Sequence, residues 1–390
     1  MVRPNKDFIV LPRGSEGVDE FLSFVARFTG LNVDTQVIWT SGVSDCMHQE
    51  VDDVIVSSLM AMVDSRPDEG FVLIPYTFTP SFVQWSQPLA QHPQVRVLGD
   101  NFEWRAIFSS KGILHRHMKS LDVPSRVELI DASIPVPQGF ICSDTEDLAR
   151  AYQAMGHQDV IVKPCRTSSG LGIVFLHSLE EVLAYSFPYG DVAIEEKLDL
   201  DYVVRSNGST EEISPAIHYM GPNIMGHFLV DQVLEGVVYS GNQPTSLDAL
   251  QQEEVMTHAV SLVRGMGPSG PGGFDFLMAQ GRPYLVDINV GRFNGSLVPK
   301  LFFGCFFNQH TNLKWLYWIE HSTPTEHIET VWERLESDGI ALQDEGADSY
   351  GVFPIRYVRD VTWAFIAIGR SDEEVRKLKE MTKEAFHLHA

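Results

Sequence analysis

The chain has 390 residues, of which 44% are hydrophobic and 21% charged, a composition that is ordinary for a soluble globular protein. Its formal net charge of −23 excludes a surface built for nonspecific binding to nucleic acid or anionic membranes, because such surfaces are basic. Any phosphate site must therefore be local and depend on a few placed cations.

The cysteines and the apolar runs predict a soluble cytoplasmic protein. The four cysteines are widely scattered and form no CxxC pair, which is typical of reduced thiols: Cys46, Cys142, Cys165 and Cys305. The N-terminus lacks the pattern of a signal peptide, and the apolar run at 301–307 is too short to span a bilayer. We expect no membrane or nucleic-acid partner, and whether the chain forms a homodimer stays open.

Residues 1–110 read as strands alternating with helices, which predicts a parallel sheet with covering helices. The strand candidates are 8–11, 36–39, 71–74 and 95–98, and the helix candidates are 18–28 and 79–89.

Residues 111–190 read as a second unit, which opens with Lys111 and a predicted helix at 113–121. A strand at 140–141 precedes a helix at 145–155, for which Ser143 or Asp144 is the expected cap. Strands at 160–163 and 173–176 are joined by the loop 164–172.

Residues 191–390 carry further strands, a helix at 250–264, and a predicted hairpin of strands 273–277 and 283–289. Beyond about residue 310 the chain looks mainly helical, including 372–386, with one strand candidate at 364–368. The sequence as a whole predicts an α/β (α+β) protein with units at 1–110, 111–190 and 191–390, the last ending in a helical tail.

The predicted hairpin carries acidic and amide side chains among apolar residues. Asp287 and Asn289 are two apart on one strand and therefore project to the same face. The hairpin also brings Asp275 near Asp287, and such oxygen ligands suit magnesium. The alternative is that Asp287 and Asn289 only mark the end of a strand, as these residue types often do near turns.

Lys163 ends an apolar strand and precedes a loop rich in small residues. Such a loop lets backbone N–H groups approach phosphate oxygens while the lysine supplies charge. The order differs from a Walker P-loop, whose lysine follows the glycines and opens a helix. The alternative is a solvated lysine beside an ordinary hairpin loop.

The segment 192–198 carries two acidic residues, Glu195 and Glu196, and is followed by Asp201. An acid and backbone groups at such an edge could read an adenine ring, and a later acid could hold ribose hydroxyls. The alternative is a charged strand end.

The GxGxxG match at 265–270 follows a predicted helix and precedes a strand, so we reject it as a dinucleotide fingerprint. His218 and His227 could contact substrate, although a lone histidine is more often structural.

Taken in order, these groups resemble the ATP-grasp superfamily. The matching pieces span roughly residues 105–310: Lys111, Lys163 before the glycine-rich loop, Glu195 to Leu198 with Asp201, Asp275, and Asp287 with Asn289 and Arg292. The resemblance implies an ATP-grasp fold preceded by a Rossmann-like pre-ATP-grasp domain at 1–110. Its central subdomain would occupy 111–190 and its C-terminal subdomain 191–390.

The resemblance also implies roles, with ATP and Mg²⁺ as the ligands. Lys111 and Lys163 would hold the phosphates, and a loop containing Ser168, Ser169, Gly170 and Gly172 would close over them. Adenine would lie at Glu195, Glu196 and the backbone near Leu198, and ribose at Asp201. Asp275, Asp287 and Asn289 would hold magnesium, with Arg292 and Lys163 as the catalytic cations. Asp275 and Asp287 stand where many members have Glu, and Asp201 is closer to the adenine segment than in many members.

The function implied by the resemblance is an ATP-dependent carboxylate–amine ligase. An acyl phosphate would form from a small carboxylate substrate, and an amine would displace phosphate, leaving ADP and an amide or peptide bond. The pattern is most similar to peptide and amino-acid ligases of specialised metabolism. Two alternatives stay open: an ATP-grasp kinase acting on a small molecule, and a non-catalytic nucleotide-binding scaffold.

Overall fold

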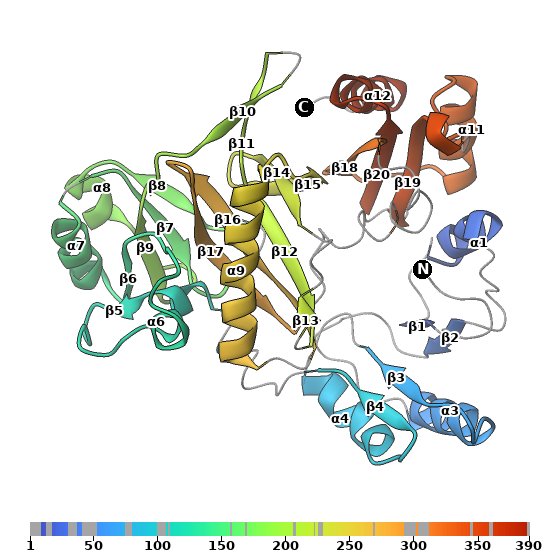
Figure 1. The fold of residues 1–390 in the computed structure, drawn as a ribbon, viewed down its shortest axis with the longest axis horizontal. Helices are drawn as coiled ribbons and strands as arrows, with labels where there is room; N and C mark the ends of the chain where they lie inside the picture. The colour runs from blue at the N-terminus through green and yellow to red at the C-terminus, as the bar shows by residue number, and fades with distance from the viewer. Residues whose placement is uncertain are drawn as a thin grey trace.

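A computed structural model describes residues 9–12, 18–29, 37–40, 53–74, 80–99, 107, 110–156, 158–167, 170–205, 208–221, 223–224, 229–267, 270–291, 302, 312–343, 346–358 and 362–387. The helices within these ranges are all too short or too polar to cross a membrane. Most of the described strands after residue 110 belong to two sheets that lie side by side, one of five strands and one of nine (Figure 1).

The described residues of the N-terminal part form two parallel strand pairs with helices between them. β1 (Ile9–Pro12) pairs with β2 (Val37–Thr40), and β3 (Phe71–Leu73) pairs with β4 (Val95–Val97). The helices are α1 (Val18–Thr29), α3 (Asp53–Asp64) and α4 (Pro80–Ala90). Each pair is parallel, as predicted, but the described strands form two separate two-stranded sheets rather than one sheet.

Helix α1 packs against the C-terminal part of the chain, which is distant from it in the sequence (Figure 1). The ring of Phe24, which is fully buried, lies 5.5 Å from that of Trp332 and 5.7 Å from that of Phe353, centroid to centroid. Aromatic pairs at such distances add to the stability that burial alone supplies.

The five-stranded sheet has the order β5-β6-β9-β7-β8. Its strands are β5 (Arg116–His117), β6 (Gly139–Cys142), β7 (Val160–Pro164), β8 (Val174–Leu176) and β9 (Val192–Glu196). The accompanying helices are α6 (Arg126–Ile130), α7 (Thr145–Ala154) and α8 (Leu179–Ala184). β7 and β8 pair antiparallel, which confirms that the loop after Lys163 joins two strands, and Asp144 caps α7.

The predicted helix at 113–121 is wrong. Residues Lys111–Leu114 form a 3-10 turn, η1, and the chain then extends as β5 beside β6. The backbone N–H of Lys111 donates to the carbonyl of Cys165 at 3.0 Å, and Leu114 is buried in the core. This docking fixes the segment before a helix can propagate, so tertiary contacts override local propensity.

The nine-stranded sheet has the order β17-β16-β12-β14-β15-β18-β20-β19, with β13 beside β12, and all its pairs are antiparallel. Its strands are β12 (Pro215–Met220), β13 (Asn223–Ile224), β14 (Val230–Glu235), β15 (Val238–Pro244), β16 (Pro271–Ala279), β17 (Arg282–Val290), β18 (Lys314–Glu320), β19 (Gly351–Val358) and β20 (Thr362–Gly369). A separate hairpin, β10 (Tyr202–Val204) with β11 (Thr210–Glu212), precedes it. The predicted hairpin around Asp275 and Asp287 is confirmed as β16 and β17.

Helix α9 (Ala249–Met266) covers one face of this sheet and shares an apolar core with Ile217, Phe274 and Phe276 (Figure 1). The helix ends in the left-handed Gly267, and β16 begins four residues later at Pro271. A helix followed by a strand is the reverse of the dinucleotide-binding order, so the rejection of the GxGxxG match is confirmed.

The mainly helical tail expected beyond residue 310 is only partly present. Helices α11 (Ile328–Ser337) and α12 (Asp372–Ala385) and the 3-10 turn η2 (Gly346–Asp348) accompany three strands, β18 to β20, that extend the large sheet. Trp315, Leu316, Tyr317 and Trp318 are all buried. A strand buried on both faces shows no alternation of apolar and polar residues, which explains why sequence periodicity missed it.

Gly139 is expected to be required for the packing of the five-stranded sheet. A Cβ atom at this position would lie 2.5 Å from the carbonyl oxygen of Ile194 and 3.0 Å from the ring of His115. Gly139→Ala should therefore lower the free energy of unfolding by roughly 1–3 kcal/mol, measured by urea denaturation. Gly70→Ala is the matched control, because a Cβ there meets nothing within 4 Å. Equal stability of the two variants would contradict the packing.

Candidate functional site

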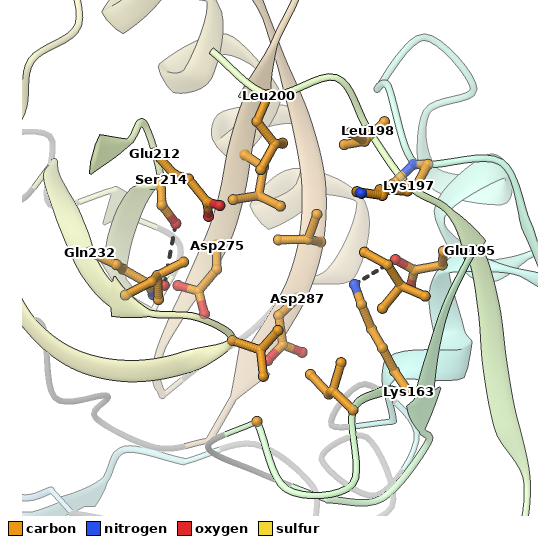
Figure 2. Close-up of a pocket in the computed structure, with 18 of the residues that line it drawn as sticks. Lys163, Glu195, Lys197, Leu198, Leu200, Glu212, Ser214, Gln232, Asp275 and Asp287 are labelled. Atoms are coloured by element: carbon orange, nitrogen blue, oxygen red, sulfur yellow. Dashed lines mark hydrogen bonds and ion pairs between the residues drawn. The ribbon is translucent and has the colours of Figure 1, made fainter. Parts of the chain in front are cut away.

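A cavity of about 430 Å³ lies between the five-stranded and nine-stranded sheets (Figure 2). It borders the face of the large sheet opposite α9, since Asp275 and Leu277 line it whereas Phe274 and Phe276 join the α9 core. Most of the described site candidates from the sequence line this cavity: Lys111, Lys163, Gly170, Glu195, Glu196, Leu198, Asp275, Asp287 and Asn289. Gly172 and Asp201 do not. Ser168, Ser169, His227 and Arg292 lie outside the described residues.

The two lysines converge because their elements are joined through the backbone. Lys163 is the last residue but one of β7, and the bond from Lys111 N–H to the Cys165 carbonyl places η1 beside that strand end. The ammonium of Lys111 lies 3.1 Å from Asp287 Oδ2 on the opposite sheet. Both lysine side chains are about one-tenth exposed, so their charges act in a setting where water screens them weakly.

Glu195 is a buried counterion rather than an open contact for a ligand. Its side chain is 1% exposed and binds Lys163 Nζ at 2.5 Å through Oε2 and His115 Nε2 at 3.0 Å through Oε1. The Lys163 pair is drawn in Figure 2. The neighbouring Glu196 accepts a bond from the Gln138 N–H at 2.7 Å. Both carboxylates line the cavity but are engaged by the protein, so the remaining groups of this segment that line it are Lys197 and Leu198.

The acid side of the cavity comes from β16 and β17. Asp275 and Asp287 are direct partners in the strand register, and Asn289 Nδ2 donates to Asp275 Oδ2 at 2.8 Å. A bulge next to this pair lets Val286 and Asp287 both face the cavity, as bulges near functional sites often do. Asp287 and Asn289 line the same wall, in agreement with the period of two predicted from the sequence.

This donor set suits a hard cation, because two carboxylates and one amide oxygen are the ligand types that magnesium prefers. Among the described residues there is no group of three or more His, Cys, Asp and Glu side chains placed to hold a metal ion. The third protein ligand would therefore be the amide oxygen of Asn289.

Asp201 is placed differently from the sequence-based expectation. Its Oδ2 accepts a 2.7 Å bond from the N–H of Gly281 in the β16–β17 turn, so it stabilises that turn. A different acid, Glu212, lines the cavity together with Ser214 and Gln232 (Figure 2). Burial raises the pKa of Glu212. Sequence reasoning missed these three residues, and the alternation of Glu212 and Ser214 before an apolar strand was the available signal.

Gly170 and Gly172 both have positive φ, 79° and 76°, which favours glycine. A Cβ on Gly170 would lie 2.6 Å from the Val237 carbonyl oxygen, so this loop passes close to the turn between β14 and β15.

His218 is buried, and burial lowers its pKa to about 3, so it is neutral at physiological pH.

Acid is expected to weaken the fold through Glu195. Burial alone would raise its pKa, but the Lys163 ammonium and the His115 bond outweigh burial and hold the pKa at about 2, below the ordinary 4.5. A carboxyl with a lowered folded-state pKa stabilises the protein fully above its unfolded pKa and loses that contribution as pH falls from about 4.5 towards 2. Urea midpoints measured between neutral pH and pH 3 should fall more steeply for the unmodified protein than for Glu195→Gln. Parallel curves would contradict this assignment.

Comparison with known proteins connects this geometry to a family. Residues 125–296 match a family model described as an ATP-grasp domain. A biotin carboxylase domain of 2-oxoglutarate carboxylase from Hydrogenobacter thermophilus, bound to MgADP, ADP and bicarbonate, matches with a TM-score of 0.55 and 14% identity over 95% of this chain and 89% of that one.

Two further solved structures share the fold. N5-carboxyaminoimidazole synthase from Aspergillus clavatus, in complex with ADP and 5-aminoimidazole ribonucleotide, matches with a TM-score of 0.57 and 10% identity over 98% of this chain and 99% of that one. A biotin carboxylase–β-γ-ATP complex from Campylobacter jejuni has a TM-score of 0.57 and 11% identity over 97% and 90% of the two chains. At these identities the likeness shows the fold. Residues 125–296 therefore match an ATP-grasp domain, and the chain has the ATP-grasp fold.

Proposed function

We propose that this protein is an ATP-dependent carboxylate–amine ligase that forms an amide or peptide bond. The observation that carries the proposal is the cavity between the two sheets, where two lysines face two aspartates and an asparagine. Cations on one wall and hard oxygen ligands on the other are what a magnesium nucleotide requires.

In this proposal the nucleotide lies along the cavity. Lys111 and Lys163 bind its phosphates, and the backbone of the Lys197–Leu198 segment binds adenine, because the Glu195 and Glu196 carboxylates are engaged elsewhere. Asp275, Asp287 and Asn289 would hold Mg²⁺, which when bound neutralises phosphate charge. Glu212 takes the ribose contact originally expected of Asp201, since it is the acid that lines this side of the cavity.

The reaction has two steps, neither of which requires a protein nucleophile. An oxygen of the substrate carboxylate attacks the γ-phosphorus of ATP, and the bond from that phosphorus to the β,γ-bridging oxygen breaks, giving an acyl phosphate and ADP. The amine nitrogen then attacks the acyl carbon, inorganic phosphate leaves, and the amine loses a proton. The lysines position the phosphates and stabilise the developing charge, which is the main catalytic demand of phosphoryl transfer. Arg292, by resemblance, would bind the transferred phosphate or the substrate carboxylate.

The substrate classes follow from the same resemblance. One structural neighbour holds bicarbonate, an acid, and another holds an aminoimidazole ribonucleotide, an amine. For this chain we propose an amino acid or small peptide as the acid and a second amino compound as the acceptor.

Product analysis tests the proposal directly. The protein is incubated with MgATP, pooled amino acids, dipeptides and bicarbonate, and nucleotides and organic products are followed by mass spectrometry. A ligase yields ADP, free phosphate and a product whose mass equals the two substrates minus water. A stable phosphorylated product without free phosphate would establish the kinase instead. AMP and pyrophosphate would contradict the acyl-phosphate route.

A further inference from the structure

His115, which the sequence did not identify as a site residue, contacts Glu195, the ion-pair partner of Lys163. The register of the five-stranded sheet places Gly139 of β6 opposite Glu195 of β9, and His115 directly precedes β5 on the far side of Gly139. The imidazole reaches across to Glu195 Oε1 at 3.0 Å, while Glu195 Oε2 lies 2.5 Å from Lys163 Nζ. A continuous chain thus runs from His115 through Glu195 to Lys163 at the cavity wall.

The absence of a side chain at position 139 makes this chain of contacts geometrically feasible. A Cβ on Gly139 would lie 3.0 Å from His115 Cε1 and 3.1 Å from His115 Nδ1. The ring therefore lies over the glycine and bridges the width of one strand. On the other side, Ile161 is the register partner of Glu195, and Lys163 is two residues further along the same strand and on the same face.

The negative charge of Glu195 requires His115 to donate the hydrogen bond between them. Burial works against ionisation of Glu195, but Lys163 and His115 hold its pKa well below the usual range, so the carboxylate accepts at both oxygens. His115 must then present an N–H at Nε2. Its side chain is 2% exposed, so little water is available to replace that donor.

The ammonium of Lys163 has three N–H donors, and the Glu195 bond orients one of them. The other two are left for the cavity, which Lys163 lines. If Glu195 lost its bond to His115, its carboxylate could rotate and bind the Lys163 ammonium through both oxygens. The ammonium would then move away from the cavity. The position of the lysine charge in the cavity depends on how Glu195 is held.

We propose that His115 is a positioning residue that acts through Glu195 to set the Lys163 ammonium for the phosphates of a nucleoside di- or triphosphate. The inference rests on the proposed function, because it requires a nucleotide in the cavity. It separates two roles: Lys163 contacts the ligand, and His115 does not.

Binding measurements with two probes test the positioning role. MgADP reports on phosphate contacts, and adenosine reports on the base and sugar alone. His115→Leu is expected to weaken MgADP binding by roughly tenfold, the size typical of a lost hydrogen bond to a charged group, and to leave adenosine binding unchanged. His115→Gln, whose amide can replace the Nε2 donor, should restore most of the MgADP affinity. If His115→Leu does not fold, His115→Asn serves in its place, because its amide is too short to reach Glu195.

A double-mutant cycle distinguishes action through the lysine from a general disturbance. His115→Leu combined with Lys163→Met should bind MgADP within about twofold of Lys163→Met alone, since the two residues act in one chain. His117→Leu, two residues along at an exposed position, is the matched control and should bind both probes normally.

The outcomes separate the two levels of the proposal. Equal weakening of MgADP and adenosine, or fully additive losses in the double mutant, would overturn the role of His115 while leaving the nucleotide site intact. An unmodified protein that binds no MgADP would overturn the proposed function, and the positioning role would fall with it.

Discussion

Lys163→Met is expected to abolish ATP-dependent turnover and to destabilise the fold at the same time. Loss of a charge aimed at the transferred phosphate should lower turnover by roughly 100- to 1000-fold. The same change leaves the Glu195 carboxylate, 1% exposed, without its cationic partner. Removing one member of a buried ion pair costs about 3–5 kcal/mol of stability, more than a surface pair would. ADP release and urea unfolding measure the two effects.

A second substitution separates catalysis from stability. Adding Glu195→Gln to Lys163→Met removes the stranded charge while keeping an oxygen that can accept the His115 bond. The double variant should recover most of the lost stability and none of the turnover. If Lys163→Met turns over ATP nearly as fast as the unmodified protein, Lys163 does not act in the phosphate site. Recovery of turnover together with stability would show that the lysine acts only on the fold.

Asp287→Asn should show a large loss of turnover with a smaller loss of stability than Lys163→Met. Removing one of two carboxylates from the proposed magnesium site is expected to lower turnover by about 100-fold, because the bound metal contributes several kcal/mol of charge stabilisation. Asp287 accepts from Lys111 Nζ through Oδ2 and from the Ile288 N–H through Oδ1, and the single amide oxygen of Asn can keep only one of these bonds. The change leaves the Lys111 ammonium, 11% exposed, without its counterion, whereas Lys163→Met leaves Glu195, 1% exposed, without its own, so the loss of stability should be the smaller of the two.

The measurement is a magnesium titration of ADP formation, with adenosine binding as a readout that needs no metal. Asp287→Asn should need more magnesium for half-maximal rate and bind adenosine normally. Asp199→Asn is the matched control, an exposed acid on the segment after β9. A magnesium dependence identical to that of the unmodified protein would exclude Asp287 as a ligand.

Local patterns in the sequence were sufficient for several elements of the site. The hairpin of β16 and β17 could be predicted because apolar residues alternate with Asp275, Asp287 and Asn289 along both strands. The tight turn between them has Gln280 and Gly281 at positive φ, 52° and 77°. These signals depend only on neighbours in the chain, so they need no knowledge of the fold.

Other features depend on contacts between distant residues and gave no local signal. The diagonal pairing of Lys163 with Glu195 requires the register of β7 against β9. His115 reaches Glu195 only because β5, β6 and β9 lie in that order with Gly139 between them. Asp201 binds the Gly281 N–H, 80 positions away in the chain, and this leaves the cavity to Glu212.

The sequence by itself therefore determined the kinds of chemical group that this protein brings to its site: a lysine near a strand end, a glycine-rich loop, and an acid and an amide spaced two apart. The tertiary structure decided which of those groups face the cavity and which neutralise one another inside the protein. The physical reason is that side-chain type and strand alternation are local properties. Strand register and the burial of a charge are set by packing between segments far apart in the chain.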